Sequence, residues 1–536
     1  MVEGIHHLGW AGGSTWYMLG RVDAQGSLLE TRHVRRHLVT KGSFYERLAD
    51  HGHEVVADED FAHLYAEGKG RPSVPPSVMV RAMLCATHDR TSDSETSRRT
   101  RVDSDWKAAM GVDDWFEGIG ATTFSLMRAR MVAHDADGAL FAKTLELAVE
   151  KGIFRQPLTA VIDSSPVHGA GAVASTYELV RKLMGRLARA LGDNLDAGLV
   201  AKALALAAAK PDIDWQGPAA RKAHLGELVD LAASMLGTAV ADKELMADPE
   251  VAEAAGLLSQ VVLQDLEAGA DGPALRQGVA PDRVVSHSDP EMRHGRKSAS
   301  RRFDGHKLDV MIDEASEMVL GVEVRAGNAG DGEGAAPLLA KVTETGGIEV
   351  ATLLADMAYS DGDVREAVEA QGTDLVAKVP PVTNSGRFPK TGFGIDLGSG
   401  TVTCPAGQVT TDARPAKDHK GRPATMFYFD ARTCEICPLR DRCTAGKGGR
   451  TIMVGRHHRR IEAARAAQSQ PATKSLLRRR AKVERKIDHL QDLGMRKARY
   501  RGRRKTRLQA LLAATVANFK RLSVIGVLQG AHIAVA

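Results

Sequence analysis

Two short apolar runs, both rich in β-branched residues, end at an aspartate. LTAVID stops at Asp163 and EVATLLAD stops at Asp356. Uninterrupted apolar runs of this length, bounded by turn residues, are typical of strands buried on both faces of a sheet. We therefore expect each aspartate at a strand end, held by rigid backbone and able to point into a cleft. The alternative is an aspartate that only caps a turn, and the Ser-Ser-Pro that follows Asp163 fits that use well.

The segments between and around these runs predict a mixed α/β sheet. FDGHKLDVMID and MVLGVEVRAG, joined by the turn EASE, have the alternation of a β-hairpin. SDGDVREAVEAQG is typical of a helix that ends at a glycine, and DLVAKVPP of a further strand. The order is therefore strand, inserted helices, hairpin, strand, helix, strand, which is an α/β arrangement.

Composition and periodicity divide the chain into segments. We expect these: an irregular N-terminal segment 1–35, a helical domain 36–150 that is either a DNA-binding helix-turn-helix or a plain helical bundle, the first core strand 151–165, a helical insertion 166–283, the core hairpin and strands 284–381, a Cys-rich insertion 382–470, and basic C-terminal helices 471–536 that complete the core.

A third acid, Glu484, lies on the basic helix predicted for LLRRRAKVERKIDHL. Arg480 precedes it by four residues and Asp488 follows it by four, so all three share one helix face. The simple interpretation is a surface ion-pair stripe. The functional interpretation makes Glu484 a metal ligand and Arg480 a phosphate contact, with Asp488 as a rival third acid and Asp361 as a rival of Asp356.

Three carboxylates that meet in one place repel one another unless cations join them. Paired Mg²⁺ ions held by carboxylates catalyse displacement at phosphorus, and the surrounding charge indicates nucleic acid. Residues 474–507 hold fifteen basic and only three acidic residues, an excess that favours a polyanionic partner over a merely solvated helix pair. The candidate DNA contacts are Arg480, Arg485, Lys486, Arg496 and Lys497 on the late helices, and Arg293, Arg296, Lys297, Arg301 and Arg302 in a string that can follow a phosphate backbone.

Four of the five cysteines form a separate cluster. Cys434 and Cys437 are spaced to chelate one ion, with Cys404 before them and Cys443 after them. A loop-rich segment with little apolar content needs such a support, so we predict a structural Zn²⁺ site. An iron–sulfur cluster uses the same ligands, and four unrelated reduced thiols remain an alternative. Cys85 lies on an apolar helix face and is expected in a core.

The N-terminus lacks a basic segment followed by an apolar core, so no secretory signal is expected. The Ala-rich stretches carry lysines and are too short to span a bilayer. We therefore expect a cytoplasmic location.

Several stretches resemble one family, the DDE transposases of bacterial insertion sequences. The similar segments are Asp163 with the SSPVHGAGAVASTYELVRKL after it, DPEMRHGRKSASRRFDGHK, ADMAYSDGDV, CPLRDRC, RKARYRGRRKTRLQALLAATVANFKRL and the earlier PPSVMVRAML. Together they span about residues 36–525. Related transposases often show tyrosine, arginine, glutamate and lysine around the third acid. Arg480 and Glu484 match that spacing, whereas Leu477 and Gln491 stand in the tyrosine and lysine places.

This resemblance implies a ribonuclease-H-like core in which Asp163, Asp356 and Glu484 hold two Mg²⁺ (or Mn²⁺) ions. It further implies cleavage of the element's terminal inverted repeats in double-stranded DNA, joining to target DNA, a homodimer on DNA, and a nucleoid-associated location in a bacterial cytoplasm. The alternatives are a catalytically inactive DNA-binding protein derived from a transposase, a nuclease of the same core without strand transfer, and a non-enzymatic zinc module for RNA.

Overall fold

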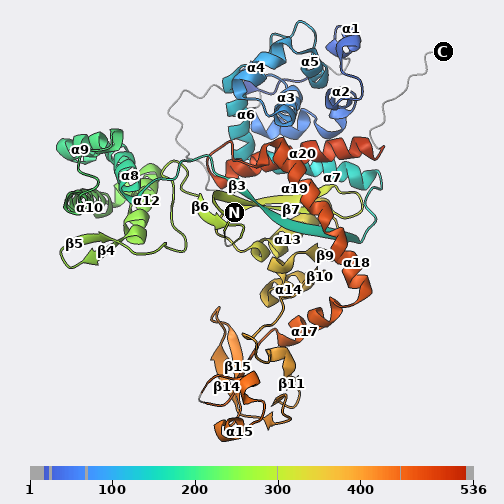
Figure 1. Ribbon diagram of the computed structural model, residues 1–536. Helices are drawn as coiled ribbons and strands as arrows, with labels where there is room; N and C mark the ends of the chain where they lie inside the picture. Colours follow the sequence, from blue (N-terminus) through green and yellow to red (C-terminus); the bar gives the residue numbers. More distant parts are fainter. Residues whose placement is uncertain (1–16, 23–26, 67–69, 299, 447, 527–536) are drawn as a thin grey trace.

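A six-stranded mixed sheet forms the centre of the molecule (Figure 1). The computed structural model describes residues 17–22, 27–66, 70–298, 300–446 and 448–526. The strands run in the order β10–β9–β3–β7, and both β6 and β8 pair with β7. β9 and β10 are parallel to β3, whereas β7 is antiparallel to β3, β6 and β8. The bounds are β3 Leu158–His168, β6 Arg293–Arg296, β7 Arg302–Asp313, β8 Val319–Ala326, β9 Val350–Ala355 and β10 Asp374–Ala377. The predicted mixed α/β class is therefore confirmed.

Helices cover and connect this sheet. α13 follows β8 and α14 follows β9, while α19 packs on β3 and β7, and α20 packs on β8. Their bounds are α13 Ala335–Gly346, α14 Gly362–Glu369, α17 His458–Ala467, α18 Pro471–Arg479, α19 Ala481–Leu490 and α20 Arg503–Val524.

An N-terminal group of helices lies above the sheet in Figure 1. Two of its helices begin with a serine that accepts the N–H of a glutamate three residues on, Ser43 with Glu46 in α2 and Ser92 with Glu95 in α4, which is the spacing of a capping box. The bounds are α1 Thr31–Val34, α2 Phe44–Val55, α3 Pro76–Asp89, α4 Asp93–Val102, α5 Ser104–Met110, α6 Ala121–Ala133 and α7 Ala136–Glu150, with the short pair β1 Tyr17–Met18 and β2 Arg71–Pro72. The expected irregular segment 1–35 lies largely outside the described residues.

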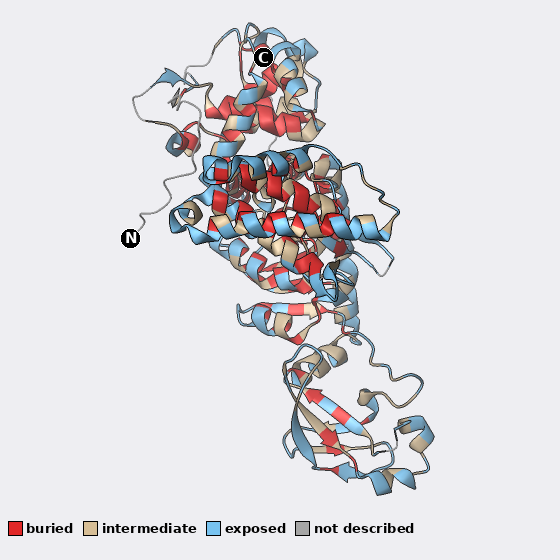
Figure 2. Cartoon of the chain, turned by 90° about the vertical axis from the view of Figure 1, so that its left-hand side faces the viewer, coloured by how far each residue is buried: buried red, intermediate tan, exposed pale blue. Residues whose placement is uncertain are grey.

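Two further units project from the sheet. A helical bundle between β3 and β6 has its own core, built on α8, α10 and α12. Its elements are α8 Thr176–Leu191, α9 Ala197–Ala208, α10 Pro218–Ala241, α11 Lys243–Ala247, α12 Pro249–Asp265, β4 Leu266–Gly269 and β5 Gly272–Leu275. The Cys-rich unit between β10 and α17 is smaller and mostly exposed (Figure 2). Its elements are β11 Gly394–Asp396, β12 Thr401–Thr403, β13 Val409–Thr410, β14 Ala413–Lys417, β15 Pro423–Tyr428, α15 Ala431–Glu435, α16 Arg440–Cys443 and β16 Thr451–Gly455.

Several local predictions were wrong. β3 does not stop at Asp163 but continues to His168, because it pairs with β7 as far as Gly305. A Cβ at Gly305 would lie 2.1 Å from the carbonyl oxygen of Val167, so only glycine allows this close approach. The segment expected to be wholly helical ends in the β4–β5 hairpin. The helix predicted for LLRRRAKVERKIDHL is divided at Arg480 into α18 and α19. After α19 the chain forms a π-helical turn at Gln491–Met495, where Gly494 adopts a φ of 102°.

One continuous hydrophobic core joins the N-terminal helices to the sheet. It extends in sequence from Phe44 to Leu522 and includes Trp106 and Phe519, both almost fully buried. α20 lies between the two groups and packs on α3, α7 and β8. The N-terminal helices are therefore fixed to the sheet by packing rather than by a flexible tether.

Among the helices of the described residues, none is both long and apolar enough to cross a membrane.

A buried asparagine in α20 generates a stability prediction. Asn518 donates to the carbonyl of Val319 at 2.9 Å and to Oγ1 of Thr144 at 3.0 Å, and it accepts the N–H of Val319 at 2.7 Å. Asn518→Leu leaves both backbone groups without partners in a dry core, so we expect a loss of about 3 kcal/mol in the free energy of unfolding. Calorimetry should show the main transition moving to lower temperature. The control, Lys505→Ala at an exposed position of the same helix, should change stability by less than about 0.5 kcal/mol, and an equal shift in both variants would contradict the assignment.

Candidate active site

Asp163 and Asp356 lie where β3 and β9 run side by side. The parallel register pairs Val161 of β3 with Leu354 of β9. Asp163 lies two residues after Val161, and Asp356 lies two residues after Leu354. Residues two apart on a strand point to the same face, so the register directs both carboxyl groups towards one cleft. Asp356 directly follows β9, and its Oδ1 accepts the N–H of Ala358 at 2.8 Å.

α19 brings Glu484 to the same cleft. The guanidinium of Arg480, at the start of α19, donates to Oδ2 of Asp163 at 3.0 Å and to Oε1 of Glu484 at 2.5 Å. The three acids expected from the sequence are thus brought together in a cleft of about 440 Å³. Its lining residues are Asp163, Ser164, Ser165, Pro166, Arg296, Lys297, Phe303, Lys307, Asp331, Asp356, Arg480, Glu484, Ile487, Asp488 and Gln491.

The two rival acids are placed differently. Asp488 also lines the cleft and is exposed. Asp361 caps α14 and accepts from Lys420 and Arg422, at 2.8 and 2.9 Å. It does not line the cleft, so Asp356 and not Asp361 shares the site with Asp163.

Burial in the cleft disfavours the charged form of Asp163. The side chain of Asp163 is 18% exposed, and its burial, followed by repulsion from Asp356 and Glu484, raises its pKa to about 6. The N–H of Ser164, at 2.7 Å from Oδ1, and the charge of Arg480 act in the opposite direction. The effect of burial and of the neighbouring acids on Asp163 therefore outweighs that of the Ser164 N–H and Arg480.

A second layer of polar residues, which the sequence analysis did not identify, supports the first strand. Nζ of Lys307 lies 2.6 Å from Oδ1 of Asp331, and the hydroxyl of Ser164 donates to the same oxygen at 2.7 Å. The sequence feature that could have predicted this network is the alternation of Lys307 and Asp309 in the run FDGHKLDVMID, which is otherwise apolar. Charged residues on a buried face need partners.

Asp309 and Arg325 fix the loop that carries Asp331. Asp309 is fully buried, which raises its pKa to about 6 although the guanidinium of Arg325 lowers it. Arg325 donates to Oδ1 of Asp309 at 2.8 Å and also to the carbonyls of Gly330 and Asp331, at 2.8 and 3.1 Å. These hydrogen bonds from Arg325 therefore fix the backbone around Asp331.

Two parts of the chain match family models of transposases. Residues 403–523, which include Glu484, match the model described as "Transposase DDE domain". Residues 33–130 match the model described as "Transposase domain (DUF772)". Both matches support the resemblance to insertion-sequence DDE transposases. No curated protein and no solved structure gives a significant match.

The basic residues that were expected at DNA fall into distinct groups. Arg296, Lys297 and Arg480 line the acid cleft, and Arg301, Arg302, Arg496 and Lys497 are exposed. The rest are engaged elsewhere. Arg293 pairs with Asp282 at 2.6 Å, and Arg485 pairs with Glu317 at 3.0 Å. The string 293–302 is also not a free loop, because β6 pairs with β7.

Lys486 is buried on the apolar face of α19, together with Val483 and Ile487. Burial lowers its pKa to about 8. A buried ammonium group cannot reach a phosphate backbone, so this position is removed from the candidate contacts.

Of the two departures from the family signature, one lies in the cleft. Gln491 lines it and donates to Oγ of Ser165 at 3.0 Å. Leu477 lies outside it, on α18. A neutral amide therefore stands where related transposases often have a lysine.

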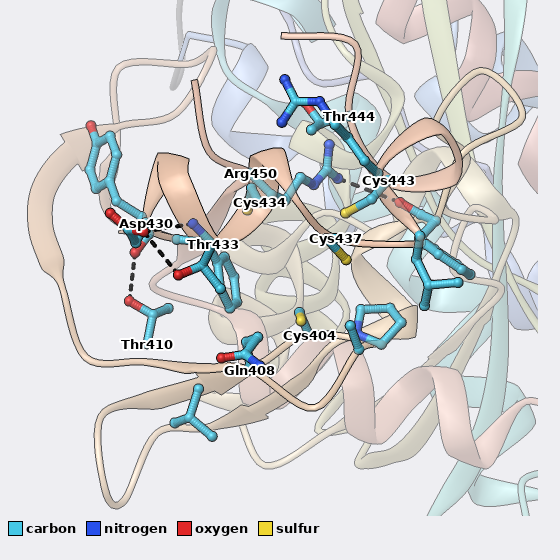
Figure 3. Close-up of a pocket in the computed structure, with 18 of the residues that line it drawn as sticks. Cys404, Gln408, Thr410, Asp430, Thr433, Cys434, Cys437, Cys443, Thr444 and Arg450 are labelled. Carbon is cyan, nitrogen blue, oxygen red and sulfur yellow. Dashed lines mark hydrogen bonds between the residues drawn. The ribbon is translucent and has the colours of Figure 1, made fainter. Parts of the chain in front are cut away.

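The four clustered cysteines line a single cavity of about 370 Å³ in the Cys-rich unit (Figure 3). Cys404 comes from the turn after β12, Cys434 and Cys443 from α15 and α16, and Cys437 from between these helices. The pKa of the Cys443 thiol is raised by burial and then by its neighbouring cysteines, against the influence of Arg450. No disulfide joins these cysteines, all of which lie in the described part of the chain. Cys85 is buried in the main core, as expected.

One further group of potential metal ligands was not expected from the sequence. Atoms of Asp363, Glu366 and His457 lie within 4.8 Å of one another. However, Asp363 already accepts from Arg422 at 2.8 Å and from Arg456 at 2.6 Å, and the Arg422 contact lowers its pKa strongly. The group therefore serves as an ion-pair network that ties α14 to the end of the Cys-rich unit.

The raised pKa of Asp163 predicts a pH-dependent stability. A carboxyl group whose pKa is raised on folding stabilises the fold below its unfolded value of 3.8, and this contribution is lost as the pH rises through about 6. The amide of Asp163→Asn is uncharged at every pH, so the variant avoids the destabilisation that the buried carboxylate causes at high pH. In a chelator, urea unfolding should show the variant more stable than wild type by about 2 kcal/mol near about pH 8, with the difference vanishing below about pH 4.

Glu146→Gln, at an exposed position of α7, serves as the control and should show no such trend. A constant difference between Asp163→Asn and wild type across this range would contradict the assignment.

Proposed function

We propose that this transposase cleaves the ends of a DNA element and joins them to target DNA by metal-dependent phosphoryl transfer at the acid cleft. The observation that carries the proposal is the meeting of Asp163, Asp356 and Glu484 in one cleft, from positions far apart in the chain. A hairpin on one side of β3 and parallel strands on the other support the further proposal of a ribonuclease-H-like core.

The donor set suits Mg²⁺ or Mn²⁺. Carboxylate oxygens are the ligands that these hard cations prefer, and Arg480 already places a positive charge between Asp163 and Glu484. Asp163, Asp356 and Glu484 would hold two ions, which would supply an activated attacking oxygen and stabilise the leaving 3′-oxygen.

The other residues of the cleft would orient the DNA. Arg296, Lys297 and Lys307 line the same space and would neutralise phosphate groups on either side of the reacting one. Arg480 would exchange its carboxylate partners for a phosphate when ions bind, because its planar fork matches either anion. The remaining polar network keeps Ser164, and hence the strand that carries Asp163, in a fixed position.

The partner is double-stranded DNA, comprising the terminal inverted repeats of the element and its target. We propose that the helices of residues 36–150 bind these repeats; the match of residues 33–130 to a transposase domain supports this role. Their shared core with the sheet would fix the distance between the bound repeat and the cleft. Because two ends must be held at once, a homodimer on DNA is part of the proposal.

Cys404, Cys434, Cys437 and Cys443 are proposed to hold a structural Zn²⁺. Four thiols facing one cavity (Figure 3) are the donor set of a closed zinc site. The buried core of this unit is small, with six buried apolar residues, so bound metal would contribute much of its stability.

A DNA-cleavage assay tests whether the three acids are catalytic. Asp163→Asn, Asp356→Asn and Glu484→Gln should each lower Mg²⁺-dependent cleavage of terminal-repeat DNA by about a thousandfold or more, because a neutral side chain cannot hold the ions. Binding to the same DNA should persist in gel-shift assays. The repeats would be taken from the sequences that flank the coding region.

Asp488→Asn and Asp361→Asn are the matched controls and should keep most activity. Loss of cleavage in Asp488→Asn with full activity in Glu484→Gln would reverse the assignment of the third acid. Cleavage without joining in a strand-transfer assay would identify a nuclease instead.

Metal content tests the cysteine site. Cys437→Ser should lower the zinc in the purified protein from about one equivalent to a small fraction, because three thiolates and a hydroxyl bind Zn²⁺ weakly. Protease digestion should then cut first within residues 382–457. Cys85→Ala should retain its metal, and equal metal content in both variants would exclude the site.

A further inference from the structure

We propose that an open groove beside the acid cleft binds an unpaired strand of DNA that leaves the cleft; this inference rests on the proposed function. The groove measures about 610 Å³. It is lined by Met357, Lys378, Val379, Pro381, Gln468, Lys474, Leu477 and Arg478.

Residues that are neighbours in the chain line the groove and the acid cleft. Met357 lines the groove, and the preceding residue, Asp356, lines the cleft. On the other wall, Lys474, Leu477 and Arg478 belong to α18, which packs on β9 and β10 and leads directly into α19. Figure 1 shows α18 beside these strands, below α19. A strand held at the acids can therefore continue into the groove.

The cations of the groove have no anionic partner. Within the described part of the chain, the side chains of Lys378, Lys474 and Arg478 make no hydrogen bond or ion pair, and no carboxylate lines the groove. All three are exposed. Uncompensated cations that converge on one groove attract a polyanion.

The basic residues next to the groove, in contrast, are paired with carboxylates. Arg479 and Lys482 both pair with Glu314, and Arg480 pairs with Asp163 and Glu484. The adjacent cavity of about 770 Å³ also holds arginines, but there Asp361, Asp418 and Glu462 line the wall too. The lack of counter-charge is thus a property of this groove and not of the basic helices in general.

The apolar lining favours an unpaired strand over a duplex. Met357 is 41% exposed, and Val379, Pro381 and Leu477 lie around the same space. A duplex presents mainly phosphates to a surface of this kind, whereas an unpaired strand also presents base faces, which pack on apolar side chains. The carbonyl oxygen of the Gln468 side chain accepts the N–H of Val379 at 2.9 Å, which holds the two walls together.

The test is binding by the full-length protein without divalent ions. The probes are a mixed-sequence duplex with blunt ends and the same duplex with a single-stranded tail. Wild type should bind the tailed probe about tenfold more tightly. Lys474→Glu with Arg478→Glu should abolish this preference and reduce the salt dependence of tailed binding by about two ions.

Two further variants sharpen the result. Lys243→Glu with Arg276→Glu makes the same change of charge at exposed positions of the helical insertion and should keep the tail preference. Met357→Ala should weaken the preference without changing the salt dependence, because it removes only apolar contact. Circular dichroism checks that each variant is folded.

Three outcomes would overturn the proposal: no tail preference in wild type, an unchanged preference in the groove variant, or an equal loss for blunt and tailed probes, which would indicate a duplex contact. The acids are tested separately. If Asp356→Asn keeps the tail preference while wild type fails to cleave, the groove stands and the proposed function does not.

Discussion

The charge of the acid cleft is the constraint on which the arrangement of the late helices depends. The parallel register of β3 and β9 places Asp163 and Asp356 together, and burial, with repulsion from Asp356, raises the pKa of Asp163. Arg480 offsets part of that cost and in doing so connects β3 to α19. The docking of α19 is therefore both a packing event, through Val483 and Ile487, and an electrostatic one.

This coupling links distant parts of the chain. The polypeptide leaves the sheet after β10, forms the Cys-rich unit, and returns through α17 and α18 to α19. The ion pairs of α14 with Arg422, Arg456 and Arg460 hold the returning segment near the sheet. A well-folded Cys-rich unit consequently helps to deliver Glu484 to the cleft, although its cavity does not adjoin the acids. The N-terminal helices are fixed on the opposite side, through the core that α20 shares with them.

The sequence was sufficient to predict the elements whose pattern is local. The apolar runs ending at Asp163 and Asp356 each predicted a strand, and the spacing of Arg480 and Glu484 predicted one helix face. The end of β3 could not be predicted in this way, because Ser164, Ser165 and Pro166 have turn propensities that pairing with β7 overrides. The contact of Lys307 and Ser164 with Asp331 depends on tertiary approach alone. The burial of Lys486, in contrast, was detectable, since Val483, Lys486, Ile487 and Leu490 have the spacing of one buried face.

The basic residues show why charge in a sequence does not measure nucleic-acid binding. Of the fifteen between residues 474 and 507, many serve the fold. Arg499 pairs with Asp93, Arg503 with Glu291, and Arg504 with Asp135, so these residues fasten the final helix and the segment before it to neighbouring parts of the molecule. Because a carboxylate already compensates the charge of each of these arginines, they interact only weakly with a phosphate. Among the residues without such a partner, Lys474 and Arg478 line the groove on α18. The pairing of each basic residue, and not the number of basic residues in the sequence, therefore determines which positions are available to a phosphate, and this is why the proposed path of the strand follows α18.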